Sequence, residues 1–224
     1  MNFRYPIFLD LAGKQCLVTG EHAEMAAKIR ALLDAGAHVV YVNPRAGPAI
    51  ADLSHAGCIE WRAHTFQPED LSDCFLVITG QDDNSEVFRL AEERNILCNA
   101  VDDPEHCRFS FGSVHRRGDL TVAISTNGWA PALAVRLRQQ LEREIGPEYG
   151  DFLALLREVR AEINSRISDF ATRRDLWYRI VDSDVLDKLR SGQREAAVRS
   201  IRQMMDAAFS STSHSDTSGE DVDR

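Results

Sequence analysis

The side chains best suited to chemistry follow a short apolar run, Ile96–Val101. Asn99 lies within this run, Asp102 and Asp103 come directly after it, and Pro104 stops it. Open parallel sheets bind ligands at the carboxyl ends of their strands, and a carboxylate held there can act as a general base. We therefore predict that Asp102 is catalytic, although Asp-Pro is also common turn chemistry.

A second candidate site is the turn Gly20-Glu21-His22-Ala23-Glu24-Met25, between the first apolar run and a helix. A dinucleotide pyrophosphate binds at such a turn because glycines let the backbone approach it and the helix N-terminus supplies N–H donors. Only the first glycine of Gly-x-Gly-x-x-Gly/Ala is kept. Glu21 and Glu24 would also favour the helix dipole without any ligand. If a dinucleotide binds, a protonated His22 would partly offset the charge of Glu21.

The second apolar run, His38–Val42, ends in Asn43. The acid that usually accepts the ribose 2′-hydroxyl of NAD is therefore missing from this position. Arg45 is close enough in sequence to hold a phosphate, but a lone surface arginine can simply be solvated. These residues do not distinguish NAD from NADP.

Polar residues also follow the apolar run Cys74–Thr79, in the order Gln81-Asp82-Asp83-Asn84. They can line a ligand crevice at the sheet edge. Asp83 or Asn84 can equally cap the helix that follows, since both residue types are preferred N-caps.

His115-Arg116-Arg117 forms a basic cluster in a chain with a net charge of -9. Such a cluster can hold a polycarboxylate ligand or face another subunit. An ordinary solvated turn is the alternative. The net charge itself argues against general nucleic-acid binding.

The five cysteines form no Cys-x-x-Cys pair, and the seven histidines have no metal-ligand spacing. We therefore predict no metal site. Cys16, Cys74 and Cys98 lie within or beside apolar runs, which predicts small core side chains. No apolar run approaches the roughly 20 residues of a membrane span, and the N-terminus lacks a signal-peptide core. We therefore expect a cytoplasmic protein.

Alternating strands and helices are expected to position these residues. The expected strands cover residues 14–19, 38–42, 59–63, 74–79 and 96–101, and the expected helices cover 23–35, 49–56 and 85–94. Continuous apolar strands alternating with helices are typical of a parallel sheet covered on both faces. The first half of the chain is therefore predicted to be a doubly wound α/β domain.

The pattern changes in the second half. Residues 109–114 and 120–125 are expected to be strands of a hairpin that turns over His115–Asp119, since Gly118-Asp119 is turn chemistry. A helix is expected from Pro131, because apolar residues recur at i+4 spacing as far as Ile145. Residues 149–209 have a helical pattern throughout, and the tail from residue 210 has no apolar anchor.

Several motifs occur in the order found in a known family. After an opening Tyr5–Leu11 segment they are Leu33-Asp-Ala-Gly-Ala37, Asp82-Asp83, Asn99-Ala-Val-Asp102-Asp-Pro104, Arg117-Gly-Asp-Leu120 and Ala123-Ile-Ser-Thr126-Asn-Gly-Trp-Ala-Pro131. Together they resemble the precorrin-2 dehydrogenase/sirohydrochlorin ferrochelatase family, the N-terminal module of siroheme synthase. The resemblance covers residues 3–208.

The resemblance implies NAD-dependent oxidation of precorrin-2 to sirohydrochlorin and, in some members, insertion of Fe²⁺ to give siroheme. It also implies a homodimer and matches Asp102 with the family's catalytic aspartate. The predicted fold is α/β, a Rossmann-like parallel-sheet domain followed by a dimerisation segment and a helical C-terminal domain. The predicted parts are an NAD-binding domain (1–112), a dimerisation segment (113–148), a helical domain (149–209) and a disordered tail (210–224).

Pattern and resemblance together give two sets of predicted site residues. Those for NAD are Gly20, His22, Ala23, Glu24, Asn43, Pro44, Arg45, Thr79, Gly80 and Asp82. Those for the tetrapyrrole are Asn99, His115, Arg116, Arg117, Ser125, Thr126, Asn127 and Gly128.

The sequence departs from the family pattern in two loops. Gly20-Glu21-His22 stands in place of three glycines, and Thr79-Gly80-Gln81 stands in place of Ala-Ala-Thr. A second hypothesis is therefore a metal chelatase or sirohydrochlorin-binding protein that has lost NAD binding. A third is a regulatory dimer that senses a small anionic ligand.

Overall fold

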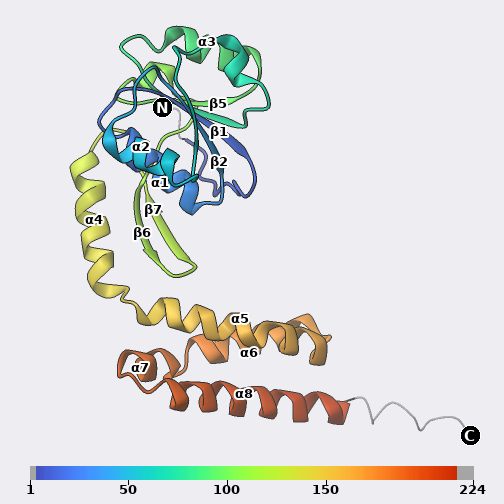
Figure 1. Ribbon diagram of the computed structural model, residues 1–224. Helices are drawn as coiled ribbons and strands as arrows, with labels where there is room; N and C mark the ends of the chain where they lie inside the picture. Colours follow the sequence, from blue (N-terminus) through green and yellow to red (C-terminus); the bar gives the residue numbers. More distant parts are fainter. Residues whose placement is uncertain (1–3, 216–224) are drawn as a thin grey trace, which may run out of the picture. The chain divides into compact units, whose positions relative to one another are not determined.

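The structure, a computed structural model, describes the backbone of residues 4–215 and the side chains of residues 4–210 (Figure 1). The chain passes from one compact unit to a second between Phe111 and Gly112. Among the described residues, no helix combines the length and the apolar character that crossing a membrane requires.

The first unit is built on a five-stranded parallel sheet in the order β3-β2-β1-β4-β5. The strands are β1 (Gln15–Gly20), β2 (His38–Val42), β3 (Glu60–Arg62), β4 (Leu76–Gly80) and β5 (Leu97–Ala100). The strand order reverses between β1 and β4, which makes their carboxyl ends the topological switch point where such sheets bind ligands. The predicted Rossmann-like fold is confirmed.

Helices cover both faces of this sheet. They are α1 (Met25–Asp34), α2 (Pro48–His55) and α3 (Ser85–Glu93), with 3-10 turns at Pro68–Leu71 and Pro104–His106. One core joins β1 and β2 to α1 and α2, and the other joins the opposite face of the sheet to α3. Because helices cover both faces of the sheet and exclude water, the strands consist of continuous apolar runs.

Three cysteines belong to these cores, as predicted. Cys16 and Cys98 have no exposed surface, and Cys74 is also buried. Burial raises the pKa of the Cys16 and Cys74 thiols to about 11 and that of Cys98 to about 12. These thiols therefore stay protonated at neutral pH and serve as small apolar side chains.

As far as Ser215, the second unit contains a hairpin and five helices. Its elements are β6 (Ser113–Arg117), β7 (Leu120–Ile124), α4 (Pro131–Glu144), α5 (Glu148–Arg166), α6 (Phe170–Val181), α7 (Val185–Arg190) and α8 (Arg194–Ser215). Fully buried side chains of α5, α6 and α8, including Ile163, Ile180 and Met205, form one helical core.

Two sequence-based boundaries in this unit were wrong. The first hairpin strand begins at Ser113, and it includes residues 115–117, which were predicted to lie in the turn. Arg117 pairs directly with Leu120, so the turn is only Gly118-Asp119. Helix α8 continues to Ser215, past the predicted start of disorder at residue 210, because Phe209 still packs in the helical core. Residues 216–224 of the predicted tail lie outside the described part of the chain.

Candidate functional site

The carboxyl ends of β1 and β4 approach closely at the switch point. Gly20 has a φ of 101°, a conformation that side chains disfavour. A Cβ at Gly20 would overlap the backbone of Gly80 and lie 2.8 Å from the amide nitrogen of Gln81. The one glycine kept from the dinucleotide pattern is therefore also required by the sheet.

The two loops that depart from the family pattern fit each other. A Cβ at Gly80 would lie 2.7 Å from the Cβ of His22 and would overlap the end of the Met25 side chain. His22 and Met25 stand at the second and third glycine positions of the pattern. A bulkier first loop is thus matched by a smaller residue at the end of β4.

His22 links the first loop to the end of β5. Its Nδ1 accepts a hydrogen bond from the backbone N–H of Glu24 at 3.2 Å, so the neutral ring carries its proton on Nε2. Nε2 lies 3.3 Å from the carboxylate oxygen Oδ2 of Asp102. The fold therefore joins a predicted cofactor residue to the predicted catalytic carboxylate.

Asp102 is both a turn residue and an open carboxylate. Its backbone is left-handed, with a φ of 58°, and its side chain is 84% exposed. Sequence reasoning expected a general base with some desolvation, and the structure instead leaves this carboxylate facing solvent beside His22. Asp102 is therefore a turn residue whose carboxylate remains open to solvent.

Asp103 is the centre of a network that sequence reasoning missed. Its Oδ2 accepts hydrogen bonds from His106 Nδ1 at 2.7 Å and from Asn84 Nδ2 at 3.2 Å. The bond from His106 is the largest cause of the lowered pKa of Asp103, and that from Asn84 adds to it. The i,i+3 spacing of Asp103 and His106 across a proline-started turn was the available signal.

The two candidate helix caps, Asp83 and Asn84, have different hydrogen-bond partners. Asp83 accepts the backbone N–H of Ser85 at 2.9 Å at the start of α3. The buried Asn84 side chain instead accepts from the Thr79 hydroxyl at 2.8 Å and from the Gln81 N–H at 3.1 Å. Asn84 therefore ties the end of β4 to Asp103.

The carboxylate of Glu21, which follows β1, lies at the end of β2. Asn43 Nδ2 and Arg45 Nε each donate to Oε1 of Glu21 at 3.2 Å. The hydrogen bond from Asn43 and the charge of Arg45 lower the pKa of Glu21. The Tyr41 hydroxyl donates to the Gly20 carbonyl at 2.8 Å and fixes this loop. Glu21 thus supplies the acid that position 43 lacks.

A cavity of 470 Å³ lies between the first loop and the start of α2, within the size range of small-molecule sites. Of the residues predicted to contact the cofactor, His22, Ala23 and Arg45 line it, together with Glu21 and Tyr41. The others, which do not line it, are Gly20, Glu24, Asn43, Pro44, Thr79, Gly80 and Asp82.

The predicted substrate residues belong to both units, Asn99 to the first and the others to the second. Asn99 is buried and donates to the Phe109 carbonyl at 2.9 Å, which holds the segment after β5. Ser125 Oγ accepts the N–H of Asn127 at 3.1 Å, and Thr126 Oγ1 accepts that of Ala130 at 3.3 Å. These hydroxyls shape the turn that leads into α4, where Asn127 and Gly128 both have positive φ.

The predicted basic cluster at residues 115–117 was wrong as a single patch. Side chains alternate along β6, so His115 is buried while Arg116 is exposed. His115 Nε2 lies 3.0 Å from the Ile145 carbonyl, a contact inside the second unit. The predicted hairpin turn was too long. Residues 115–117 were therefore expected to share one surface, whereas they belong to strand β6.

Comparisons with known proteins give the family. A sirohaem biosynthesis protein central model matches residues 117–144 and a sirohaem synthase dimerisation model matches 148–205, after a putative NAD(P)-binding model over 7–113. The chain is 35% identical over 205 residues to a siroheme synthase of Sodalis glossinidius and 37% identical over 203 residues to one of Methylobacillus flagellatus. The chain belongs to the family of siroheme synthase N-terminal modules.

The alignments with these siroheme synthases cover 90% and 89% of the chain but only 44% of each relative. The chain thus spans less than half the length of these relatives. A solved structure, SirC, named as a precorrin-2 dehydrogenase, shares the fold with a TM-score of 0.74. That comparison covers 89% of this chain and 99% of SirC at 23% identity. The resemblance inferred from the motifs is confirmed, and the NAD(P)-binding model supports a nicotinamide cofactor.

Proposed function

We propose that this chain oxidises precorrin-2 to sirohydrochlorin, with NAD⁺ as the hydride acceptor. One observation carries the proposal: Asp102 presents an open carboxylate at the end of β5, 3.3 Å from His22 of the dinucleotide loop. Membership of the siroheme synthase family supplies the substrate class. The oxidation removes one hydride and one proton from precorrin-2.

The residues around the first loop fit a dinucleotide. Gly20 itself is buried against the backbone of Gly80, and the 470 Å³ cavity beside the loop has apolar walls from Ala23 and Tyr41. These residues would hold the adenosine half of the cofactor, and the bound nicotinamide ring would accept the hydride. The His22 side chain occupies space beside the loop, and it fits there because Gly80 has no Cβ.

The charges at the end of β2 favour NAD over NADP. Glu21 is positioned by Asn43 and Arg45, at the strand end where an acid accepts the ribose 2′-hydroxyl in such folds. A 2′-phosphate would meet the charge of Glu21, while Arg45 is already paired with that carboxylate. These charges support NAD as the cofactor in this proposal.

Asp102 handles the proton that leaves with the hydride. Its exposed carboxylate can approach the substrate, and the Nε2 proton of His22, 3.3 Å away, orients it. His22 is in this sense a positioning residue.

An anaerobic assay of precorrin-2 with NAD⁺, following NADH and the tetrapyrrole spectrum together, tests the proposal. Asp102→Asn is expected to lower turnover about 100-fold or more, as loss of a general base does. Glu105→Gln, an exposed acid on the adjoining turn, is the matched control and should keep wild-type turnover. Stoichiometric NADH in the wild type supports the reaction, and unchanged turnover in Asp102→Asn removes Asp102 from it.

A chelatase or sirohydrochlorin-binding protein without NAD is the second candidate. The observation that favours it is the side chain of His22 in a position where the family has glycine. Among the side chains of residues 4–210, no three His, Cys, Asp or Glu groups gather as a metal site. Calorimetry distinguishes the two candidates, because tight NAD⁺ binding would exclude this one.

Fe²⁺ insertion, the homodimer and the cytoplasmic location remain predictions, and the dimerisation model over 148–205 supports assembly.

A further inference from the structure

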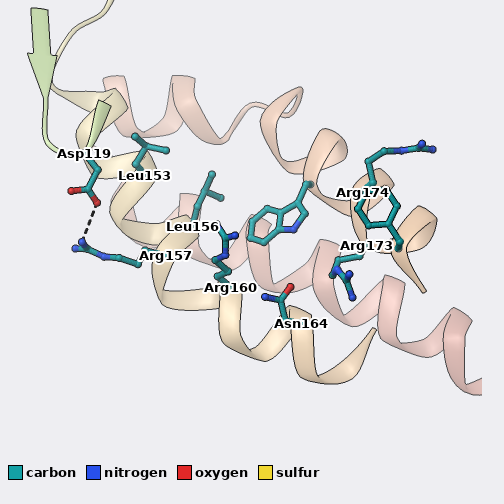
Figure 2. A pocket seen from close by; sticks show the side chains of 10 residues that line it. Asp119, Leu153, Leu156, Arg157, Arg160, Asn164, Arg173 and Arg174 are labelled. Carbon is teal, nitrogen blue, oxygen red and sulfur yellow. Dashed lines mark hydrogen bonds and ion pairs between the residues drawn. The ribbon is translucent and has the colours of Figure 1, made fainter. Parts of the chain in front are cut away.

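A cavity of 810 Å³ lies within the helical unit, bordered by α5 and α6 (Figure 2). Arg157 and Arg160 line it from α5, and Arg173 and Arg174 line it from α6. Asp119, at the hairpin turn, is the one acid among the lining residues. The lining therefore carries an excess of positive charge in a chain whose net charge is -9.

Two of these arginines, Arg160 and Arg173, have no carboxylate within 4 Å among residues 4–210, although the charge of Arg173 helps to lower the pKa of Asp169. Among residues 4–210, no acidic side chain lies within ion-pair distance of Arg160. Arg173 donates to the backbone carbonyl of Ile167 at 2.8 Å, so it satisfies the end of α5 and keeps its charge. Both guanidinium groups are thus available to an anionic ligand.

The other two arginines have exchangeable partners. Arg157 pairs with Asp119 at 3.0 Å, as the dashed line in Figure 2 shows, and both side chains are more than half exposed. Arg174 pairs with its neighbour Asp175 at 2.8 Å, also at the surface. Exposed pairs of this kind stabilise the protein little, so a ligand carboxylate can replace the partner at small cost.

The rest of the lining is apolar and aromatic. Phe170 is 69% exposed and lies beside Arg173, whose guanidinium is 6.0 Å from the ring centroid. Trp177 is partly buried against the helical core and also lines the cavity, as do two leucines of α5. Flat apolar surface next to arginines suits a planar ring system with charged substituents.

We propose that this cavity binds a large macrocyclic polycarboxylate, with its carboxylates on the arginines and its ring against Trp177 and Phe170. Arginine holds carboxylates in bidentate geometry, which gives both affinity and orientation. The volume of 810 Å³ is within the range of sites for large organic ligands. The inference rests on the proposed function, because a tetrapyrrole substrate is the ligand of this chemical class.

Titration of the full chain with sirohydrochlorin, followed by absorbance, tests the site. Arg157→Gln/Arg160→Gln is expected to raise the Kd about tenfold or more, since two charged hydrogen-bond donors are lost. Arg179→Gln/Arg199→Gln removes the same charge from the helical unit outside the cavity and should leave the Kd near the wild-type value. Circular dichroism and thermal melting confirm that both variants are folded.

Asp119→Asn gives a test of opposite sign. Removing this acid frees Arg157, so the Kd for sirohydrochlorin is expected to fall. Equal Kd values for the two double-arginine variants, or no binding by the wild type, would overturn the inference.

The NADH assay separates this inference from the proposed function. If the wild type binds sirohydrochlorin through the cavity arginines but forms no NADH from precorrin-2, the cavity stands and the oxidation fails. If Arg157→Gln/Arg160→Gln turns over precorrin-2 with wild-type kcat and KM and wild-type Kd, the oxidation stands and the cavity fails.

Discussion

Three side chains at the end of β2 carry the proposal that this chain uses NAD rather than NADP. Asn43 alone is a poor partner for a ribose hydroxyl, and Arg45 alone suggests a phosphate. Glu21 changes both conclusions, because it accepts hydrogen bonds from the two of them. At the residue scale, the proposed preference for NAD therefore depends on a carboxylate that comes from the β1–α1 loop.

Glu21→Gln is expected to shift the ratio of kcat/KM for NADP⁺ to that for NAD⁺ upward by about tenfold or more, since Arg45 then lacks its anionic partner. Steady-state kinetics with precorrin-2 and each cofactor measures the ratio. Glu21→Gln/Arg45→Ala should lose most of the gain, because the phosphate partner is gone. A ratio that stays at the wild-type value in Glu21→Gln would mean that another group selects the cofactor.

At the scale of elements, the close approach of β1 and β4 couples two loops. Gly20 is needed where the strands meet, and Gly80 is needed where His22 and Met25 lie over β4. The departures from the family pattern in the two loops are therefore one structural change.

This coupling predicts a double-mutant cycle. Gly80→Ala should destabilise the wild type, because its Cβ would lie 2.7 Å from that of His22. The same substitution should cost less in a His22→Gly background, with a coupling energy of about 0.5–3 kcal/mol in urea unfolding. Gly47→Ala, where φ is -64° and a Cβ would meet open space, serves as a control for adding a methyl group without crowding. Additive effects of His22→Gly and Gly80→Ala would contradict the coupling.

At the scale of the whole molecule, α4 bears apolar side chains without buried partners. Leu133 is 52% exposed, and Leu137 on the same helix face is 39% exposed. Trp129, just before the helix, is 86% exposed. Exposed apolar groups gathered on one helix mark an interaction surface. They fit the predicted homodimer and the predicted dimerisation segment at 113–148, whereas the dimerisation model of the family matches residues 148–205.

Leu133→Asp/Leu137→Asp is therefore expected to weaken the dimer, since burying two carboxylates in an apolar contact costs several kcal/mol. Sedimentation equilibrium should report a dimer for the wild type and a monomer for this variant at the same concentration. Leu53→Asp is unsuitable as a control because Leu53 packs against the core of the first unit. Arg136→Asp, on an exposed part of α4, tests for a pure charge effect. A wild-type monomer would refute the predicted homodimer.

The sequence by itself determined the layered α/β domain and the place of Asp102. Both faces of the sheet are covered, so the strands are uninterrupted apolar runs that can be recognised one by one. Asp102 follows such a run, and the order of motifs identified the family. The limits of the first hairpin strand were less certain, because the turn type decides which residues alternate.

Only the tertiary structure decided which side chains meet. Glu21 and Arg45 belong to different loops, as do His22 and Asp102, and they come together because parallel strands end at one edge. The arginines of the helical cavity lie on two helices whose patterns record only their buried faces. Local periodicity follows from burial and can be read along the chain. The pairing of exposed polar groups follows from how loops and helices are placed in space, which no local pattern encodes.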